Sequence, residues 1–309
     1  MPTTIPPTRN LSIVFQFVGM GLVWGASFLF MKVALDGVSF YQVAWARLVF
    51  GGLTLGLVVL LTRQRLPRER VVYLHFLVIA VTNCVIPHLA FAWAEQYVSS
   101  GLASIYNAVT PITTALMVTL AFRVERLNRG QLLGIAIGIV GVVVIIAPWQ
   151  HDGFSGNLAG QLACLLAAVC YGFSFGYIRT FLSHRPIPGA SFAFLNIGVA
   201  GAIMLLLTPV IAWQPVRLDP GIVASLLTLG VLGTGIAYIW HINVLRAWGP
   251  TNASTVTYIT PVVGVLLGVL VLGETFSANQ PLGAVLVLVG ILFTQQRIRL
   301  SRRTLGAAR

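Results

Sequence analysis

The second half of this chain repeats the pattern of the first at an offset of about 150 residues, and this repeat limits the folds open to it. Residues 103–111 and 253–261 share an Ala-Ser pair followed, at the same spacing, by a Thr-Pro pair. Residues 24–28 and 171–175 share an aromatic-Gly-x-Ser-Phe pattern. We therefore expect one structural unit used twice.

Composition makes the bilayer the solvent of both units. Of the 309 residues, 57% are hydrophobic and 8% are charged, and the mean hydropathy of +0.91 excludes an ordinary soluble domain and a disordered chain. Each apolar run is continuous and long enough to span as a helix, which needs about 20 residues, rather than as an alternating barrel strand. Ten spans are predicted, at residues 12–32, 41–62, 71–92, 100–121, 129–147, 157–179, 189–213, 221–245, 252–273 and 279–296.

Five helices per unit is an odd number, so the second unit must enter the membrane from the opposite side. The sequence thus predicts an all-α integral membrane protein of two inverted five-helix repeats, residues 1–150 and 151–309. Transporters built this way bind substrate near the bilayer midplane between the repeats and work by alternating access.

Positive charges orient the helices. With the N-terminus in the cytoplasm, 16 of the 19 Lys and Arg fall on the inner side, as the positive-inside rule requires. They are Arg9, Arg63, Arg65, Arg68, Arg70, Arg123, Arg126, Arg129, Arg179, Arg185, Arg246, Arg297, Arg299, Arg302, Arg303 and Arg309. Both termini are therefore expected in the cytoplasm, and the net charge of +12 does not indicate nucleic-acid binding.

The cysteines and the spaced glycines are expected to have packing roles. Cys84, Cys164 and Cys170 all fall inside predicted helices, where they are expected to pack as small apolar residues without disulfides. Glycines repeat at four-residue spacing in the second, fifth and ninth helices, which lets helix backbones approach closely. Such patterns hold a bundle together or form a homodimer face, and both interpretations stay open.

Polar groups inside the membrane are few, and each is a candidate site residue because a charge there is costly. No acid lies at the midplane, which argues against proton exchange on a central carboxylate. Glu95 is near a helix end, and the others lie in or beside loops: Asp36, Glu69, Glu125, Asp152, Asp219 and Glu274. Arg47 lies about two turns into the second helix, where it could bind a substrate carboxylate, reach the headgroups or bond helix carbonyls.

Two histidines and one asparagine are further candidates. His88 follows Pro87 in the third helix, with Asn83 about one turn earlier, and His241 lies in the eighth helix. Imidazole can bond a carboxylate or an amine or relay a proton, although packing histidines are common.

Aromatic and amide side chains could complete a mildly polar chamber. Tyr106 and Asn107 lie a turn before Pro111, and Tyr258 is close to Pro261. Trp24 and Tyr171 are the repeat-related aromatic pair, although anchoring at the interface or packing in the core is the more ordinary role for any single ring of this kind.

Three mid-helix prolines are candidate hinges. Pro87, Pro111 and Pro261 each remove a backbone hydrogen bond, which permits a bend or frees a carbonyl to face a cavity. Pro111 and Pro261 are repeat-related, which favours a matched pair of bends, although tolerated kinks remain the alternative.

These motifs resemble the EamA-type members of the drug/metabolite transporter superfamily. The resemblance rests on residues 22–28, on Ala46-Arg47, and on two Thr-Pro helices each followed by a Glu and a Gly-rich helix, and it covers nearly the whole chain. The first copy departs from the pattern because Arg123-Val124-Glu125 lacks the Gly that precedes Glu274.

The resemblance implies an inner-membrane exporter of metabolites, most like the YddG-type exporters of aromatic and other neutral amino acids. It implies a central cavity between helices one, three, four, six, eight and nine, with helices five and ten peripheral. The candidate cavity residues are then Trp24, His88, Tyr106, Asn107, Tyr171 and Tyr258, with Arg47 as the second-helix arginine.

Three other functions are alternatives to an amino-acid exporter. A transporter of other small metabolites or drugs would have the same fold, and a sensor or scaffold without transport is a further alternative. An intramembrane enzyme is not expected, since the chain has no His-Glu-x-x-His motif, no paired membrane aspartates and no nucleophile elbow. No cofactor or metal is expected; the partners are a small-molecule substrate and the lipid bilayer.

Overall fold

The computed structural model describes residues 11–150, 156–211 and 213–298. Asp152 and five of the predicted cytoplasmic charges, Arg9, Arg299, Arg302, Arg303 and Arg309, lie outside these ranges, and so does the start of the predicted second unit at residue 151.

The first half of the chain folds into five helical spans. They are α1 (Leu11–Ala34), α2 (Phe40–Leu61), α3 with η1 and α4 (Arg70–Ile79, Ala80–Val85 and Ile86–Ala94), α5 with α6 and η2 (Ser100–Asn107, Thr110–Leu116 and Met117–Ala121), and α7 (Arg129–Ile146). A short helix η3 (Pro148–Gln150) follows. Both η1 and η2 are π-helical turns, in which the hydrogen bonds span five residues instead of four.

The second half repeats the arrangement. Its spans are α8 (Gly156–Phe181), α9 (Gly189–Leu206) with the short α10 (Thr208–Ile211), α11 with η4 and α12 (Pro220–Leu227, Thr228–Ile236 and Ala237–Ala253), α13 (Val256–Leu272) and α14 (Asn279–Thr294). Eight of the described spans are long and apolar enough to cross a membrane, and α13 and α14 are shorter apolar helices. The predicted all-helical membrane protein of ten helices is confirmed.

The seventh span is shorter than predicted. It ends at Leu206 rather than at residue 213, because Pro209 cannot donate the hydrogen bond that would continue the helix. The chain instead makes the one-turn helix α10, whose Thr208 hydroxyl accepts a bond from Trp45 Nε1 at 2.9 Å.

Side-chain caps fix where two spans begin. Ser39 and Gln42 form a capping box at the start of α2, and Asn128 and Gln131 form one at the start of α7. In each, the first side chain accepts from a backbone N–H three residues later and the second returns the bond. These reciprocal bonds satisfy amides that would otherwise lack partners.

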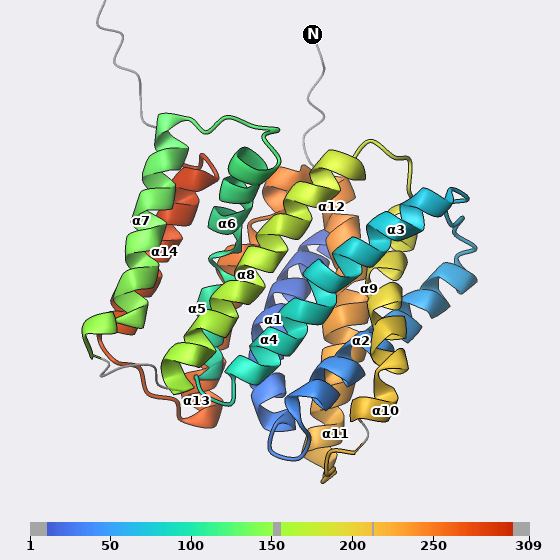
Figure 1. The fold of residues 1–309 in the computed structure, drawn as a ribbon, viewed down its shortest axis with the longest axis horizontal. Helices are drawn as coiled ribbons and strands as arrows, with labels where there is room; N and C mark the ends of the chain where they lie inside the picture. The colour runs from blue at the N-terminus through green and yellow to red at the C-terminus, as the bar shows by residue number, and fades with distance from the viewer. Residues whose placement is uncertain (1–10, 151–155, 212, 299–309) are drawn as a thin grey trace, which may run out of the picture.

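The two halves run in opposite directions. In Figure 1, α1 descends from the upper end of the bundle, whereas α8 ascends from the lower end. We call the end where α1 begins and α14 finishes the terminal face, and the opposite end the distal face. Helices of the two halves pack against each other throughout, with α2 beside α9, α1 beside α13 and α4 beside α8.

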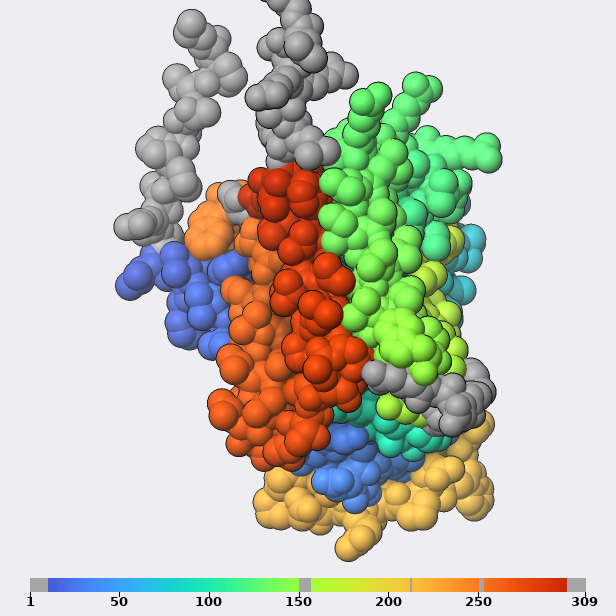
Figure 2. Space-filling view, turned by 90° about the vertical axis from the view of Figure 1, so that its left-hand side faces the viewer, coloured from blue at the N-terminus to red at the C-terminus, as the bar shows by residue number. Residues whose placement is uncertain are grey.

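Helices α7 and α14 form a pair at one edge of the bundle (Figures 1 and 2). A Cβ atom added to Gly290 would lie 2.6 Å from the Gly134 carbonyl oxygen and 2.7 Å from the Gly138 nitrogen. One added to Gly141 would lie 2.8 Å from the Gly283 oxygen. The glycine pattern of the fifth helix therefore packs helix on helix inside this chain.

We expect Gly290→Val to destabilise the protein, because the atoms that the new side chain would meet are backbone atoms that cannot move aside. Overpacking of this kind costs about 1–3 kcal/mol. Thermal unfolding in detergent should give a lower midpoint than for the parent. Ala136→Val, at an exposed position of α7, is the control and should leave the midpoint unchanged; equal midpoints for both variants would contradict the packing described here.

Candidate functional site

The best candidate site surrounds Arg47, a cation within the membrane span α2. Its Nε donates to Thr234 Oγ1 at 3.1 Å, and it makes no other hydrogen bond within the described residues. The side chain is partly exposed, and neither Nη atom is among the buried polar atoms of the described chain that lack a partner. Arg47 thus bonds a hydroxyl of the opposite half, and its two Nη groups make no hydrogen bond within the described residues.

The partner of Arg47 lies in the π-helix η4. Thr234 Oγ1 donates to the Leu229 carbonyl, five residues earlier, at 2.9 Å, and so has its lone pairs available for Arg47. A Cβ atom added to Gly51 would lie 2.6 Å from Thr234 Cγ2, so α2 approaches η4 closely because position 51 has no side chain. The wide turn and the glycine together place the hydroxyl at Arg47.

Trp24 joins this site from α1. Its Nε1 donates to the Gly233 carbonyl at 3.0 Å, and its ring centroid lies 5.8 Å from that of Tyr238 and 5.5 Å from that of His241. The His241 Nδ1 atom is buried without a hydrogen-bond partner within the described residues. These contacts link α1 to the eighth span.

Tyr171 and His88 add residues of α8 and α4 to the surroundings of Arg47. Tyr171, Tyr238, His88 and the buried Glu95 all lie within electrostatic range of the guanidinium. The Tyr171 ring is stacked beside Phe91, with centroids 6.3 Å apart. The His88 Nδ1 lies 2.6 Å from the Cys84 carbonyl oxygen, and because a carbonyl only accepts, Nδ1 carries the proton and Nε2 of the neutral ring is an acceptor.

We name this group the Arg47 cluster. It consists of Trp24, Arg47, His88, Tyr171, Thr234 and Tyr238, and it draws on both halves of the chain.

Asn83 lies beside the cluster in η1. Its Oδ1 accepts from Asn196 Nδ2 at 3.1 Å, and both side chains are buried. This amide pair holds the third span to the seventh, so Asn83 has a structural partner. Pro87 is the second residue of α4, which follows η1. The related span of the second half has its own π-helix, η4, about 150 residues later, and η4 contains no proline.

Three other predicted cavity residues lie apart from the cluster's contacts. Tyr106 is fully buried and donates to Gln161 Oε1, which holds α5 to α8. The Tyr258 hydroxyl donates to Gln295 Oε1 at 2.6 Å, toward the terminal face. Asn107 is partly buried at the end of α5, where its backbone oxygen accepts from Thr110 Oγ1 at 2.7 Å.

The remaining predicted hinges differ in local structure. Pro111 is the second residue of α6, after the break between α5 and α6, whereas Pro261 lies inside the continuous helix α13. The repeat-related prolines therefore have different backbone environments, and a hinge role for Pro87, Pro111 and Pro261 stays a prediction.

Sequence reasoning did not predict the surroundings of several polar residues. Thr234 carries only a weak signal, a polar residue within the run Gly233-Thr234-Gly235 in mid-span. Glu95 is completely buried, and its carboxylate oxygens have no hydrogen-bond partner within the described residues. Lys32 Nζ donates to the backbone oxygens of Glu95 and, at 3.1 Å, Val98, so its ammonium group is held by the loop between α4 and α5.

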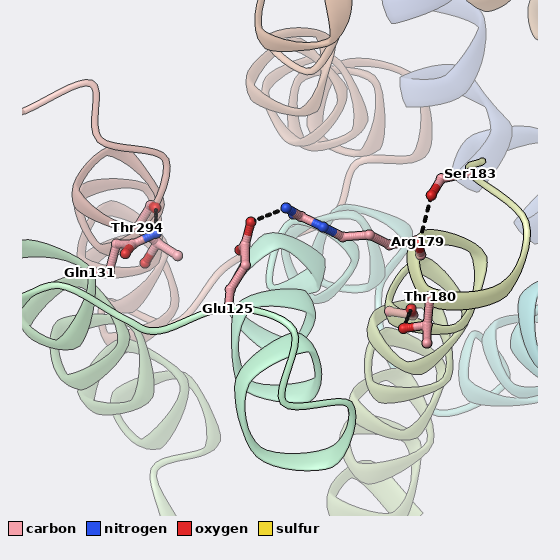
Figure 3. A network of polar contacts seen from close by, with 7 residues as sticks. Glu125, Gln131, Arg179, Thr180, Ser183 and Thr294 are labelled. Carbon is pink, nitrogen blue, oxygen red and sulfur yellow. Dashed lines mark hydrogen bonds and ion pairs between the residues drawn. The ribbon is translucent and has the colours of Figure 1, made fainter.

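A polar hollow of about 420 Å³ opens at the terminal face, away from the Arg47 cluster. Figure 3 shows the ion pair of Glu125 with Arg179 and the bond from Gln131 Nε2 to the Thr294 carbonyl oxygen at its rim. The hollow is lined by Glu125, Gln131, Arg179, Ser254, Thr294, Gln295, Gln296 and Arg297. Residues from both halves therefore border an opening toward this face.

The Arg47 cluster can recognise a small anion with an apolar or aromatic body. An open guanidinium binds carboxylates in a two-point geometry, and aromatic rings beside it favour apolar groups and cations. Among the described residues no three His, Cys, Asp or Glu side chains come together as metal ligands.

Comparisons with known proteins agree with this architecture. The chain is 26% identical to the uncharacterized transporter YdfC of Bacillus subtilis, over 94% of this chain and 93% of the relative. It is 25% identical to the uncharacterized inner membrane transporter YedA of Escherichia coli K12, over 88% and 87%. It is also 25% identical to a probable terminal-alkyne amino-acid exporter of Streptantibioticus cattleyicolor, over 96% and 95%.

A solved crystal structure shares the fold, with a TM-score of 0.62 at 20% identity, covering 94% of this chain and all of the other. The model of the EamA-like transporter family matches twice, at residues 11–147 and 158–295, so both halves of the repeat carry it. The chain is therefore a multi-pass membrane transporter, not an enzyme, and it belongs to the EamA-like transporter family.

Proposed function

We propose that this transporter exports amino acids, aromatic and other neutral ones, by alternating access between the two inverted halves. The observation that carries the proposal is the Arg47 guanidinium, which lies within a membrane span, has Tyr171 and Tyr238 within electrostatic range, and makes no hydrogen bond through its Nη groups within the described residues. A carboxylate is the ligand whose two oxygens match that pair of donors.

The surrounding side chains suit the rest of an amino acid. A substrate ammonium can lie over an aromatic face, and a neutral side chain can pack against the same rings. The buried carboxylate of Glu95 also lies within electrostatic range of Arg47, although no acidic side chain makes a hydrogen bond or ion pair with Arg47 within the described residues. The relative described as a probable terminal-alkyne amino-acid exporter and the resemblance to YddG-type exporters point the same way.

We also propose an inner, plasma-membrane location with both termini in the cytoplasm. The inner membrane is named for the relative YedA, and the basic loops gather at the terminal face. Export then runs from the terminal face to the distal face. The rival cargo is another small carboxylate or drug, and the rival outside transport is a sensor or scaffold without flux.

The cargo can be tested by flux of labelled phenylalanine, threonine and methionine into proteoliposomes. We expect saturable flux that unlabelled phenylalanine inhibits and that phenylethylamine, which lacks the carboxylate, does not inhibit. Flux without an imposed pH gradient would make transport facilitative, and flux only with a gradient would make it proton-coupled. Equal inhibition by the amine and the amino acid, or no flux of any of the three, would contradict the proposed cargo.

Arg47→Gln should lower the flux of phenylalanine about 10- to 100-fold, since a hydrogen bond between charged groups contributes about 1.5–3 kcal/mol. Arg47→Lys keeps the positive charge but loses the planar guanidinium group, so its flux should lie between that of the parent and that of Arg47→Gln. Arg217→Gln, which removes an exposed arginine near the distal face, is the matched control. Parent-like flux in Arg47→Gln, in protein of normal elution profile, would remove Arg47 from the site.

The orientation can be tested with fusions to the C-terminus. Green fluorescent protein should fluoresce there and alkaline phosphatase should be inactive, because the first folds in the cytoplasm and the second outside it. A dark fluorescent protein and an active phosphatase would place the C-terminus outside the cytoplasm and would contradict export from the terminal face to the distal face.

A further inference from the structure

Glu274 bridges the two halves at the distal face. It follows α13 in the second half, and its carboxylate accepts from the backbone N–H groups of Ser100 at 2.6 Å and Gly101 at 3.0 Å. Those residues begin α5 in the first half. An anion is favoured at a helix N-terminus, because the first amides point out of the helix without partners.

The carboxylate occupies a slot made by two glycines. A Cβ atom at Gly268 would lie 2.2 Å from Glu274 Oε2, and one at Gly101 would lie 3.3 Å from it and 2.6 Å from Phe276 Cζ. Gly273, at a φ of 65°, ends α13 in the left-handed conformation and lets the Glu274 nitrogen bond the Gly268 oxygen at 3.0 Å. The turn, the slot and the helix start all fit this one side chain.

The first half has the same turn at the terminal face. Arg123 has a φ of 56°, and the Val124 nitrogen bonds the Val118 oxygen at 3.1 Å, which matches Gly273, Glu274 and Gly268 at an offset of 150 residues. The acid here comes one residue later, as Glu125. It forms an ion pair with Arg179 of the second half instead of a two-amide cap (Figure 3).

The two faces therefore differ although the repeats correspond. At the distal face the carboxylate of Glu274 closes onto α5, and Glu95 and Lys32 nearby are held within the protein. At the terminal face the corresponding acid, Glu125, borders the hollow of about 420 Å³ together with Ser254, the repeat counterpart of Ser104. A second hollow, of about 260 Å³, is lined by residues of α2, α10 and α11 toward the distal face and includes none of the Glu274 contacts. The bonds of Glu274 therefore join α13 to α5, whereas Glu125 leaves the corresponding position beside the terminal hollow.

We propose that Glu274 is the latch of the distal gate: its bonds to Ser100 and Gly101 hold that face closed and must break each time the face opens during transport. This rests on the proposed alternating access. Loss of the carboxylate charge weakens the latch and shifts the population toward the conformation open at the distal face.

Cysteine accessibility tests the latch without any substrate. Ser104 is fully buried one turn beyond Gly101, on the inner side of the latch. With Ser104→Cys as reporter, a membrane-impermeant thiol reagent is added to intact cells, and the labelling of the parent chain with its native cysteines is subtracted. Glu274→Gln should raise the labelling rate about 10-fold, consistent with loss of one charge-assisted contact.

Glu69→Gln is the matched control, because it removes an ion pair with Arg185 that also joins the two halves but lies near the terminal face. It should leave the labelling rate unchanged. If Glu274→Gln fails to fold, Glu274→Asp keeps the charge on a shorter side chain and should also raise the rate.

Unchanged labelling in a folded Glu274 variant would overturn the latch, and so would an equal rise in Glu69→Gln. The flux assay separates this result from the proposed function. No amino-acid flux in the parent, together with increased labelling in Glu274→Gln, would contradict the proposed cargo but support the latch. Normal flux together with unchanged labelling would support the cargo but contradict the latch.

Discussion

The arrangement of this transporter depends on a cation held within a membrane span. On insertion scales a central charge costs about 2.5–3.5 kcal/mol, so Arg47 must be compensated by the protein or by a ligand. One hydrogen bond, from Nε to Thr234, comes from the opposite half of the chain. That bond requires the π-helical turn η4, in which the threonine hydroxyl bonds a carbonyl five residues back, and it requires Gly51, where a side chain would collide with Thr234. The buried carboxylate of Glu95 lies within electrostatic range of Arg47 and contributes further compensation, and in our proposal a substrate carboxylate bound to the Nη groups adds to it.

Because the two repeats are inverted, corresponding residues lie in different surroundings and make different contacts. Trp24 and Tyr171 are repeat partners, yet the first bonds a backbone carbonyl of η4 and the second stacks beside Phe91. Gly273 and Arg123 make the same left-handed turn at opposite faces, and the acids that follow have different partners. A symmetric pair of units in two environments can exchange those environments, which is the physical basis of alternating access. Helices α7 and α14 pack together along their glycines at one edge of the bundle (Figure 2).

Sequence predicts the spans well because each apolar run must be about as long as the bilayer is thick. It predicts residues such as Arg47 and Trp24 because polar and aromatic groups are conspicuous in such runs. It does not predict which of them meet. Tyr106 and Tyr258 have the composition of cavity residues, but each hydroxyl donates to a glutamine of a neighbouring helix. The contacts of Thr234 and Glu274 were not predicted, because a single threonine in a glycine run, or an acid beside a loop, is common. Their roles depend on contacts across more than 170 residues of chain.

The most direct test of this account is the distance between the substrate carboxylate and Arg47. Solid-state NMR can measure dipolar coupling between the ¹³C carboxylate of bound phenylalanine and ¹⁵N-labelled arginine side chains in lipid. Contact between a carboxylate and a guanidinium places donor and acceptor about 2.7–2.9 Å apart, which gives a strong coupling. We expect that coupling in the parent and its loss in Arg47→Lys when phenylalanine is still bound. A bound carboxylate with no coupling to arginine in the parent, or with the same coupling in Arg47→Lys, would contradict the assignment of Arg47 as the carboxylate-binding residue.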